Sequence, residues 1–382
     1  MTNRRIQEFQ RLSEESASAA LNSWHKIEES IIGNTRECQP KVIAIVPNYN
    51  NREYINDAID GLLAQREVEL TIQVIDNCSN DGSWEILEDY EKRHPNLQIY
   101  RMSRNSGPHV TGSCLLKGVM APYVIFASGN DRLMDNYFIA KAVTYIEKHP
   151  NTVLVYGKHQ RENGAMEPDS FCYSACCTNK SNDLTQKELT DIKIWDMCER
   201  FLQVVALYTS GEPLWGVYRS EALKRIPMIH GYGSDHALVS CIALFGDVIG
   251  IRRLVRKAST SHNESNSELR EVQEQSRYSI DGSTPAETYF GKFNFVSLAY
   301  TYYKAIQLLD IRKSAKVYLY DKTFDILVER FKKFYIEEVA NCECLLKKLN
   351  QMNQGTKRLN GIALIDKLES LIVLRDIKKR LL

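Results

Sequence analysis

Between residues 41 and 131, short apolar runs alternate with segments of helical spacing, and this alternation constrains the fold more than any other feature of the sequence. Four short runs rich in apolar and β-branched residues are followed by polar turns, as buried strands are: 41–46, 70–75, 97–102 and 123–127. Apolar residues three or four positions apart indicate helices between them: 53–65, 84–94 and 112–120. Strands that alternate with helices are joined by right-handed crossovers, so the sequence predicts an α/β fold with a mostly parallel sheet flanked by helices.

Both ends of the chain have helical spacing. Apolar residues from Ile6 to Ile31 mostly lie three or four positions apart, and Gly33-Asn34 provides a helix stop. After about Pro285 the helical spacing returns, and we expect three helices there: 289–309, 313–350 and 361–382. We therefore divide the chain into three parts: an N-terminal helical segment (1–37), a central α/β domain (38–265) and a helical C-terminal region (285–382).

The second half of the central domain is less regular. Helical spacing occurs at 137–148 and at 235–245. The stretch 162–191 is polar and rich in Asn, Ser, Thr and Cys, and we expect it to be a surface excursion.

Composition excludes several classes of protein. The chain of 382 residues is 43% hydrophobic and 25% charged, as ordinary globular proteins are. A net charge of +1 argues against a nucleic-acid binder that acts through bulk charge. The first residues lack the apolar core of a secretory signal, and the apolar stretch 237–251 is short for a membrane span. We expect a cytoplasmic protein.

Polar clusters follow three of the predicted strands. Ligands of parallel sheets bind at the carboxyl ends of the strands, which is where these clusters lie. The first strand ends in Pro47-Asn48-Tyr49-Asn50, the second in Asp76 with a turn over 77–83, and the fourth in Ser128-Gly129-Asn130-Asp131. A carboxylate such as Asp76 can accept hydrogen bonds from a base or a ribose, or it can cap the next helix. The oxygen-rich corner 128–131 can hold a hard cation against a diphosphate, or it can be an ordinary polar turn.

In order and spacing, these segments resemble the inverting family 2 glycosyltransferases of the GT-A (Rossmann-like) fold. That family has Pro-x-Tyr-Asn after the first strand, Asp-x-x-Ser-x-Asp-Gly-Ser after the second, then Asn-x-Gly, then Asp-x-Asp-Asp. The matching residues here are Pro47, Tyr49, Asn50, Asp76, Ser79, Asp81, Gly82, Ser83, Asn105, Gly107 and Ser128 to Asp131. The resemblance is close over residues 40–145 and loose over 205–265.

The resemblance implies that the first half of the domain binds a nucleotide-sugar donor. The candidate donor-binding residues are Pro47, Asn48, Tyr49, Asn50, Asp76, Asn105, Gly107 and Asn130.

The resemblance also implies a divalent cation, Mn²⁺ or Mg²⁺. Asp131 matches the last carboxylate of the family's metal motif, and His262 stands where a histidine of relatives can reach the metal or the diphosphate. Ser128 and Asn130 replace the two carboxylates that usually precede Asp131. The loss of charge should lower cation affinity, and so metal dependence is an open question. His262 can also be read as a surface residue.

In the second half, Asp235 matches the family's general base, and Ser234 replaces the glutamate that usually precedes it. Direct displacement at an anomeric carbon needs one such base. The alternative for Asp235 is a helix N-cap. Trp215 belongs to a segment similar to the family's acceptor side, where it could stack on a sugar or pack in the core.

The sequence thus predicts the transfer of a single sugar, with inversion, to an acceptor hydroxyl in polysaccharide biosynthesis or a related pathway. The acceptor would be a glycan, a lipid-linked glycan or a protein. The alternative is a catalytically weakened relative that binds a nucleotide sugar or a partner. The last predicted helix is amphipathic and basic, so it could lie at the inner face of a membrane, join two subunits in a homodimer or pack on the domain.

Overall fold

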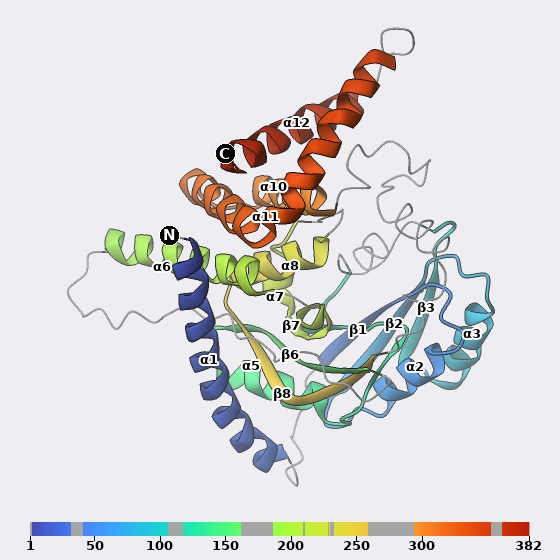
Figure 1. Ribbon diagram of the computed structural model, residues 1–382. Coiled ribbons are helices and arrows are strands. Elements are labelled where there is room, and N and C mark those ends of the chain that lie inside the picture. Colours follow the sequence, from blue (N-terminus) through green and yellow to red (C-terminus); the bar gives the residue numbers. More distant parts are fainter. Residues whose placement is uncertain are drawn as a thin grey trace.

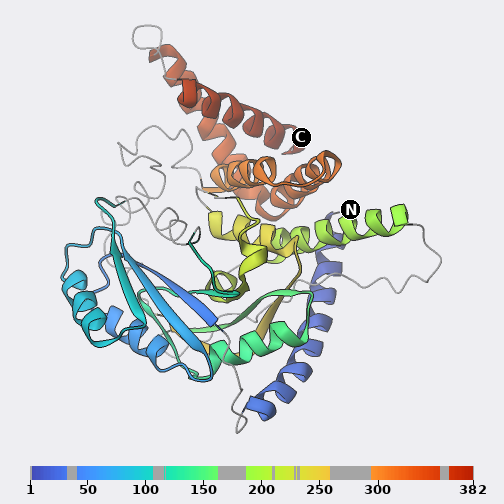
Figure 2. The same cartoon turned by 180° about the vertical axis from the view of Figure 1, so that it is seen from behind.

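The computed structural model (Figure 1) describes residues 2–31, 41–105, 116, 118–161, 186–208, 211–227, 229, 233–258, 294–352 and 361–381. A mixed sheet forms its centre, and helices cover both faces of that sheet. The N-terminal helix runs along one side, and the C-terminal helices stack on one face (Figures 1 and 2). Within the described residues no helix combines the length and the apolar character needed to cross a membrane.

The described part of the sheet has eight strands in the order β3-β2-β1-β4-β7-β6-β8-β5. Their bounds are β1 Lys41–Asn48, β2 Glu69–Asp76, β3 Leu97–Arg101, β4 Tyr123–Phe126, β5 Asp131–Leu133, β6 Thr152–Arg161, β7 Val217–Arg219 and β8 Asp247–Ala258. β1 is parallel to β2 and β4, β2 is parallel to β3, and β6 is parallel to β8. β7 is antiparallel to β4 and β6, and β5 is antiparallel to β8. The carboxyl ends of β1 to β4 therefore meet at one edge of the sheet.

The helices have the following bounds: α1 Thr2–Ile31, α2 Ile55–Leu63, α3 Ser83–Arg93, α5 Phe138–Lys148, α6 Gln186–Leu207, η1 Glu212–Trp215 (a 3₁₀ turn), α7 Ser220–Leu223, α8 Ser234–Ala243, α10 Asn294–Leu308, α11 Lys313–Met352 and α12 Gly361–Leu381.

Alternate residues of β1 serve two hydrophobic cores, because successive side chains of a strand point to opposite faces. Val42, Ala44 and Val46 pack with α2, α3 and α5 on one face. Ile45 belongs to the larger core on the other face, together with residues of α6, α8, α10, α11 and α12. The C-terminal region thus shares a core with the central domain.

The described part of α12 packs on the protein itself. Val373, Leu374 and Ile377 are buried against α10 and α11, whereas Leu371 and Ile372 are exposed. Of the three roles considered for this helix, packing is the one that residues 371–381 have in this structure. Membrane contact and a homodimer through these helices stay predictions.

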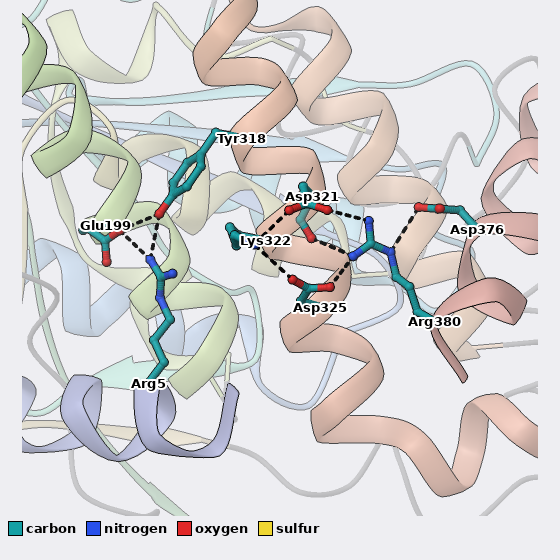
Figure 3. A network of polar contacts seen from close by, with 8 residues as sticks. All are labelled: Arg5, Glu199, Tyr318, Asp321, Lys322, Asp325, Asp376 and Arg380. Atoms are coloured by element: carbon teal, nitrogen blue, oxygen red, sulfur yellow. Dashed lines mark hydrogen bonds and ion pairs between the residues drawn. The ribbon is translucent and has the colours of Figure 1, made fainter. Parts of the chain in front are cut away.

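Ion pairs hold the outer helices in place (Figure 3). Arg380 of α12 lies 3.0 Å from Asp321 and 3.2 Å from Asp376, and it also pairs with Asp325 of α11. On the other side of α11, Tyr318 donates a hydrogen bond of 3.0 Å to Glu199 of α6, which also pairs with Arg5 of α1 (Figure 3). These contacts join α1, α6, α11 and α12, which are distant in the sequence.

The predicted fold class is confirmed, including the N-terminal helix and the C-terminal helices. One helix was missed: α6 begins at Gln186, inside the stretch expected to be a surface excursion. Residues 201–208 are all buried, so the end of α6 has no polar face and no amphipathic period to reveal it. The predicted helix at 112–120 and the excursion over 162–185 lie largely outside the described residues.

Candidate active site

The carboxyl ends of β1 and β2 are joined by two buried polar side chains. Asn48 and Asp76 occupy paired positions in the parallel register, and Asn48 Nδ2 donates a hydrogen bond of 2.8 Å to Asp76 Oδ1. Asp76 is 0% exposed and Asn48 is 1% exposed. Pro47, just before Asn48, ends the apolar run of β1, and its ring has no N–H to add to the ladder.

The turn after β2 closes over the Asp76 carboxylate. The backbone N–H of Ser79 donates to Asp76 Oδ2 at 2.9 Å, and the Ser79 hydroxyl donates to Oδ1. Arg101, the last residue of β3, lies 3.4 Å from Oδ2 through its Nε. The buried carboxylate is thereby bonded to the ends of three strands, and it fixes the loops that follow them.

The loops after β1 and β2 are also bonded directly to each other. Asn50 adopts a positive φ of 51°, which asparagine tolerates better than most residues. Its backbone N–H donates to the Ser79 hydroxyl at 3.0 Å, and its side-chain oxygen accepts from the N–H of Asn80 at 3.0 Å. Pro47, Tyr49 and Asn50 each keep part of their surface exposed at this edge.

Asp81 anchors the start of α3. Its carboxylate accepts hydrogen bonds from the N–H of Arg52 at 2.8 Å and from the N–H of Ser83 at 3.0 Å, and it also accepts one from the Ser83 hydroxyl. Burial acts to raise the pKa of Asp81, but these hydrogen bonds outweigh it and hold the pKa below its ordinary value. Gly82 between them has a φ of 93°, and a Cβ there would lie 2.7 Å from Arg52 Nη1.

The Asn-x-Gly segment lies beside the turn after β2. Asn77 Nδ2 donates a hydrogen bond of 2.6 Å to the side-chain oxygen of Asn105. Asn105 is therefore next to the Asp76 loop, as its assignment to the donor site requires. Gly107 lies outside the described residues.

The motif after β4 packs against the end of β1. A Cβ on Gly129 would lie 2.9 Å from Asn51 Nδ2 and 3.0 Å from Asn48 Oδ1, so only glycine allows this approach. Asn51 and Asn48 are themselves hydrogen-bonded at 3.1 Å. Asn130 is thereby held close to the Asn48–Asp76 pair, and the predicted donor residues Pro47, Asn48, Tyr49, Asn50, Asp76, Asn105 and Asn130 gather at one edge of the sheet.

The same motif is also the predicted cation site. Asp131 begins β5 and is 9% exposed, and the Ser128 hydroxyl hydrogen-bonds to the side-chain oxygen of Asn130. Among the described residues, no group of three His, Cys, Asp or Glu side chains could hold a metal ion. One carboxylate with two neutral oxygens is a poor match to the charge that Mn²⁺ or Mg²⁺ prefers. His262, the other candidate ligand, lies outside the described residues.

Asp235 lies in the first turn of α8, close to three tyrosines. The N-cap is Gly233, with a φ of 73°, and no side chain makes a capping hydrogen bond. The interpretation of Asp235 as the N-cap is therefore wrong, because it is the second residue of the helix. Tyr208, which follows α6, donates a hydrogen bond of 3.4 Å to Asp235 Oδ2.

Tyr218 of β7 lies near Asp235. Its ring packs edge-on against Phe126, the last residue of β4, with centroids 5.5 Å apart. Its hydroxyl donates to the carbonyls of Pro213 and Leu214 in η1. Burial raises the pKa of Tyr218 well above its ordinary value, and the negative charge of Asp235 adds to this increase.

Trp215, the predicted acceptor residue, is the last residue of η1. It is half-buried and packs against the larger hydrophobic core. The turn η1 contacts both β4 and α8, so Trp215 lies between the strand that carries the Ser128–Asp131 motif and the helix that carries Asp235. Its role toward an acceptor stays a prediction.

Sequence reasoning missed two residues of this site. Arg101 closes the Asp76 cluster, and Tyr208 contacts Asp235. The position of Arg101 at a strand end beside Asp76 was a usable signal, because parallel strands end at one edge. Tyr208 gave no signal, since it ends a helix that was not predicted.

Comparison with known proteins finds a match over part of the chain. Residues 43–201 match the model of glycosyl transferase family 2. TuaG of Bacillus subtilis strain 168, named for teichuronic acid biosynthesis, is 33% identical over 94 residues, which are 25% of this chain and 37% of TuaG. The poly(ribitol-phosphate) β-N-acetylglucosaminyltransferase TarS of Staphylococcus aureus strain Mu50 is 30% identical over 134 residues, which are 34% of this chain and 23% of TarS.

Solved structures agree on the fold. The crystal structure of S. aureus TarS 1–349 in complex with UDP-GlcNAc aligns with a TM-score of 0.51 and 15% identity, over 89% of this chain and 90% of that one. At this identity the likeness shows the fold alone. The sequence alignments span well under two thirds of the curated relatives, 37% of TuaG and 23% of TarS.

Proposed function

We propose that the protein transfers a single sugar from a nucleotide-sugar donor to an acceptor hydroxyl with inversion, because residues 43–201 match the model of glycosyl transferase family 2. One observation supports this most strongly. The residues that match the family's donor motifs lie together at the carboxyl edge of β1 to β4, and Asp235 lies near Tyr218 of β7, whose ring packs against Phe126 at the end of β4.

We propose two different roles for the donor residues. Pro47, Tyr49 and Asn50 have exposed surface and would contact the nucleotide, as would Asn105 and Asn130 on the neighbouring loops. Asn48 and Asp76 are buried and bonded to each other. Their part is to hold those loops in a binding-competent arrangement, which limits the ordering that the donor must impose when it binds.

Asp235 is the proposed general base. Its carboxylate would accept the proton of the acceptor hydroxyl while that oxygen attacks the anomeric carbon and the bond to the nucleoside diphosphate breaks. The displacement occurs from the side opposite the leaving group, so the configuration inverts. The first turn of α8 favours the negative charge of Asp235 before the reaction.

A divalent cation would supply charge to the departing diphosphate. In this chain Asp131, with His262 as the second candidate, would hold it. Because the described motif offers one carboxylate, we propose that cation binding is weak in the absence of the donor, whose phosphates are themselves ligands.

For the acceptor we propose a hydroxyl of a cell-surface polymer. The relatives support this choice: one is named for teichuronic acid biosynthesis, and another transfers N-acetylglucosamine to poly(ribitol phosphate). Trp215 is the proposed acceptor-side contact.

A donor panel tests this proposal. The full chain is incubated with UDP-GlcNAc, UDP-glucose or GDP-mannose, with and without Mn²⁺, in the presence and absence of poly(ribitol phosphate), and nucleoside diphosphate release is measured. We expect release from one donor, increased by an acceptor. Binding of a nucleotide sugar without release from any donor would support the alternative, a catalytically weakened relative, which the loss of carboxylates at Ser128 and Asn130 favours.

A further inference from the structure

The C-terminal region reaches the site through one arginine. Arg330 of α11 donates a hydrogen bond of 3.0 Å from Nη2 to the backbone carbonyl of Tyr208, and Nη1 donates to the carbonyl of Val205. Both carbonyls lie at the end of α6, where the last carbonyls of a helix have no partner within that helix. A cation is favourable at this position because the helix dipole is negative there.

The residue that Arg330 holds is the one that touches the proposed base. Tyr208 is 1% exposed, and its hydroxyl donates to Asp235 Oδ2 at 3.4 Å. Its ring also packs on His236, with centroids 4.1 Å apart. The backbone and the side chain of Tyr208 therefore connect α11 to the first turn of α8.

Among the described residues, the other ionisable groups near Asp235 come from its own helix and from two further elements. They are Tyr218 of β7, His236 of α8 and Tyr302 of α10. Burial lowers the pKa of His236; Asp235 opposes this shift, and the Arg330 cation reinforces it. Burial raises the pKa of Tyr302 and of Tyr218. The imidazole and both phenols are thus neutral near pH 7, so the hydroxyl of Tyr208 can act as a fixed donor to the carboxylate.

We infer that Tyr208 is a positioning residue for the Asp235 carboxylate and that Arg330 holds Tyr208 in place, so that the C-terminal helix α11 supports the base. The inference rests on the proposed function, in which Asp235 takes the acceptor's proton. A contact of 3.4 Å is long for a hydrogen bond between oxygens, and such contacts tighten when substrate binds.

The test compares Tyr208→Phe, Arg330→Met and Arg330→Lys in the full chain. The control is Arg380→Met, which removes an arginine of comparable burial that joins α12 to α11. The donor that the panel identifies is used, and kcat, the KM for donor and the pH profile of kcat are measured. Tyr208→Phe keeps the buried ring and removes only the hydroxyl, so it separates positioning from packing.

We expect Tyr208→Phe and Arg330→Met to lower kcat about tenfold, the effect of losing one hydrogen bond to a charged group, with the KM for donor unchanged. In Tyr208→Phe the pH profile of kcat should differ from that of the wild type, because the carboxylate loses a hydrogen-bond donor. Arg330→Lys should recover part of the loss, and Arg380→Met should keep the wild-type profile.

Failure of this inference is distinguishable from failure of the proposed function. If Asp235→Asn retains turnover, the assignment of the base fails. If Asp235→Asn is inactive while Tyr208→Phe has a wild-type kcat and pH profile, the positioning role is overturned. The Asp235→Asn Tyr208→Phe double variant should be no slower than Asp235→Asn alone, and a further loss would contradict a role that acts through Asp235.

Discussion

Asn48 and Asp76 face each other at the carboxyl ends of the parallel strands β1 and β2, and the amide of Asn48 donates a hydrogen bond of 2.8 Å to the buried carboxylate of Asp76. Ser79 and Arg101 complete the cluster. In the sequence this motif suggests a set of ligand contacts, but in the structure some of its residues hold the loops together. We call the cluster of Asn48, Asp76, Ser79 and Arg101 the brace. In the proposed function the motif's partly exposed members contact the donor, while its buried members hold the loops.

The brace predicts that Asp76→Ala lowers both the stability of the fold and the affinity for the donor. The substitution leaves Asn48 and Arg101 without their acceptor, so the free energy of unfolding should fall by about 1–3 kcal/mol. Affinity for UDP should fall at least about tenfold, because the loops lose their fixed arrangement. Urea denaturation and calorimetry measure the two effects. Asp321→Ala, which removes a half-buried carboxylate that pairs with Arg380, is the control, and equal UDP binding by both variants would contradict the brace.

Asp81 predicts a specific pH dependence of stability. Its pKa is lowered in the folded chain, so its contribution is present above the unfolded pKa near 3.8 and is lost as the pH falls through the lower folded value. Asp81→Asn should therefore have a lower Tm than the wild type at pH 7. The difference should narrow below pH 4, at about the ordinary pKa of the group. Thermal denaturation of both proteins across this range checks the prediction, and a constant difference at all pH values would refute it.

The motif after β4 predicts a gain of cation affinity. Asn130→Asp restores a carboxylate beside Asp131, so Mn²⁺ should bind more tightly in the presence of UDP, by about tenfold if the new charge is worth about 1.4 kcal/mol. Calorimetric titration of Mn²⁺ into the UDP complex measures this affinity for Mn²⁺. Asn80→Asp, which adds the same charge at an exposed position of a neighbouring loop, is the control. Identical titrations for the two variants would remove residue 130 from the cation site.

Much of the fold could be predicted because apolar residues recur at regular spacings along its strands and helices. The runs at 41–46 and 70–75 correspond to β1 and β2, and the C-terminal helices lie close to their expected bounds. The residues at the strand ends could also be placed at one edge, because parallel strands share their direction. The sequence therefore predicted that these residues lie together, and their role toward a donor stays a prediction.

What could not be predicted depends on contacts between distant parts of the chain. Helix α6 was missed because its end is buried on all sides, and Tyr208 was missed with it. The bond from Arg330 to the Tyr208 carbonyl spans 122 positions, and no local period encodes such a contact. Which residues of a motif become buried, as Asp76 does, is likewise decided by tertiary packing.

Asp235→Asn is the measurement that tests the central claim most directly. Asn keeps the size and the position in the first turn of α8 and removes the basicity. We expect kcat to fall about a hundredfold or more, the lower end of what a positioned base contributes, while the affinity for UDP and the Tm hardly change. Ser234→Ala, the neighbouring position in the same turn, should retain most of the turnover. Near-normal kcat for Asp235→Asn would contradict the account, because it would show that the carboxylate takes no proton in the reaction.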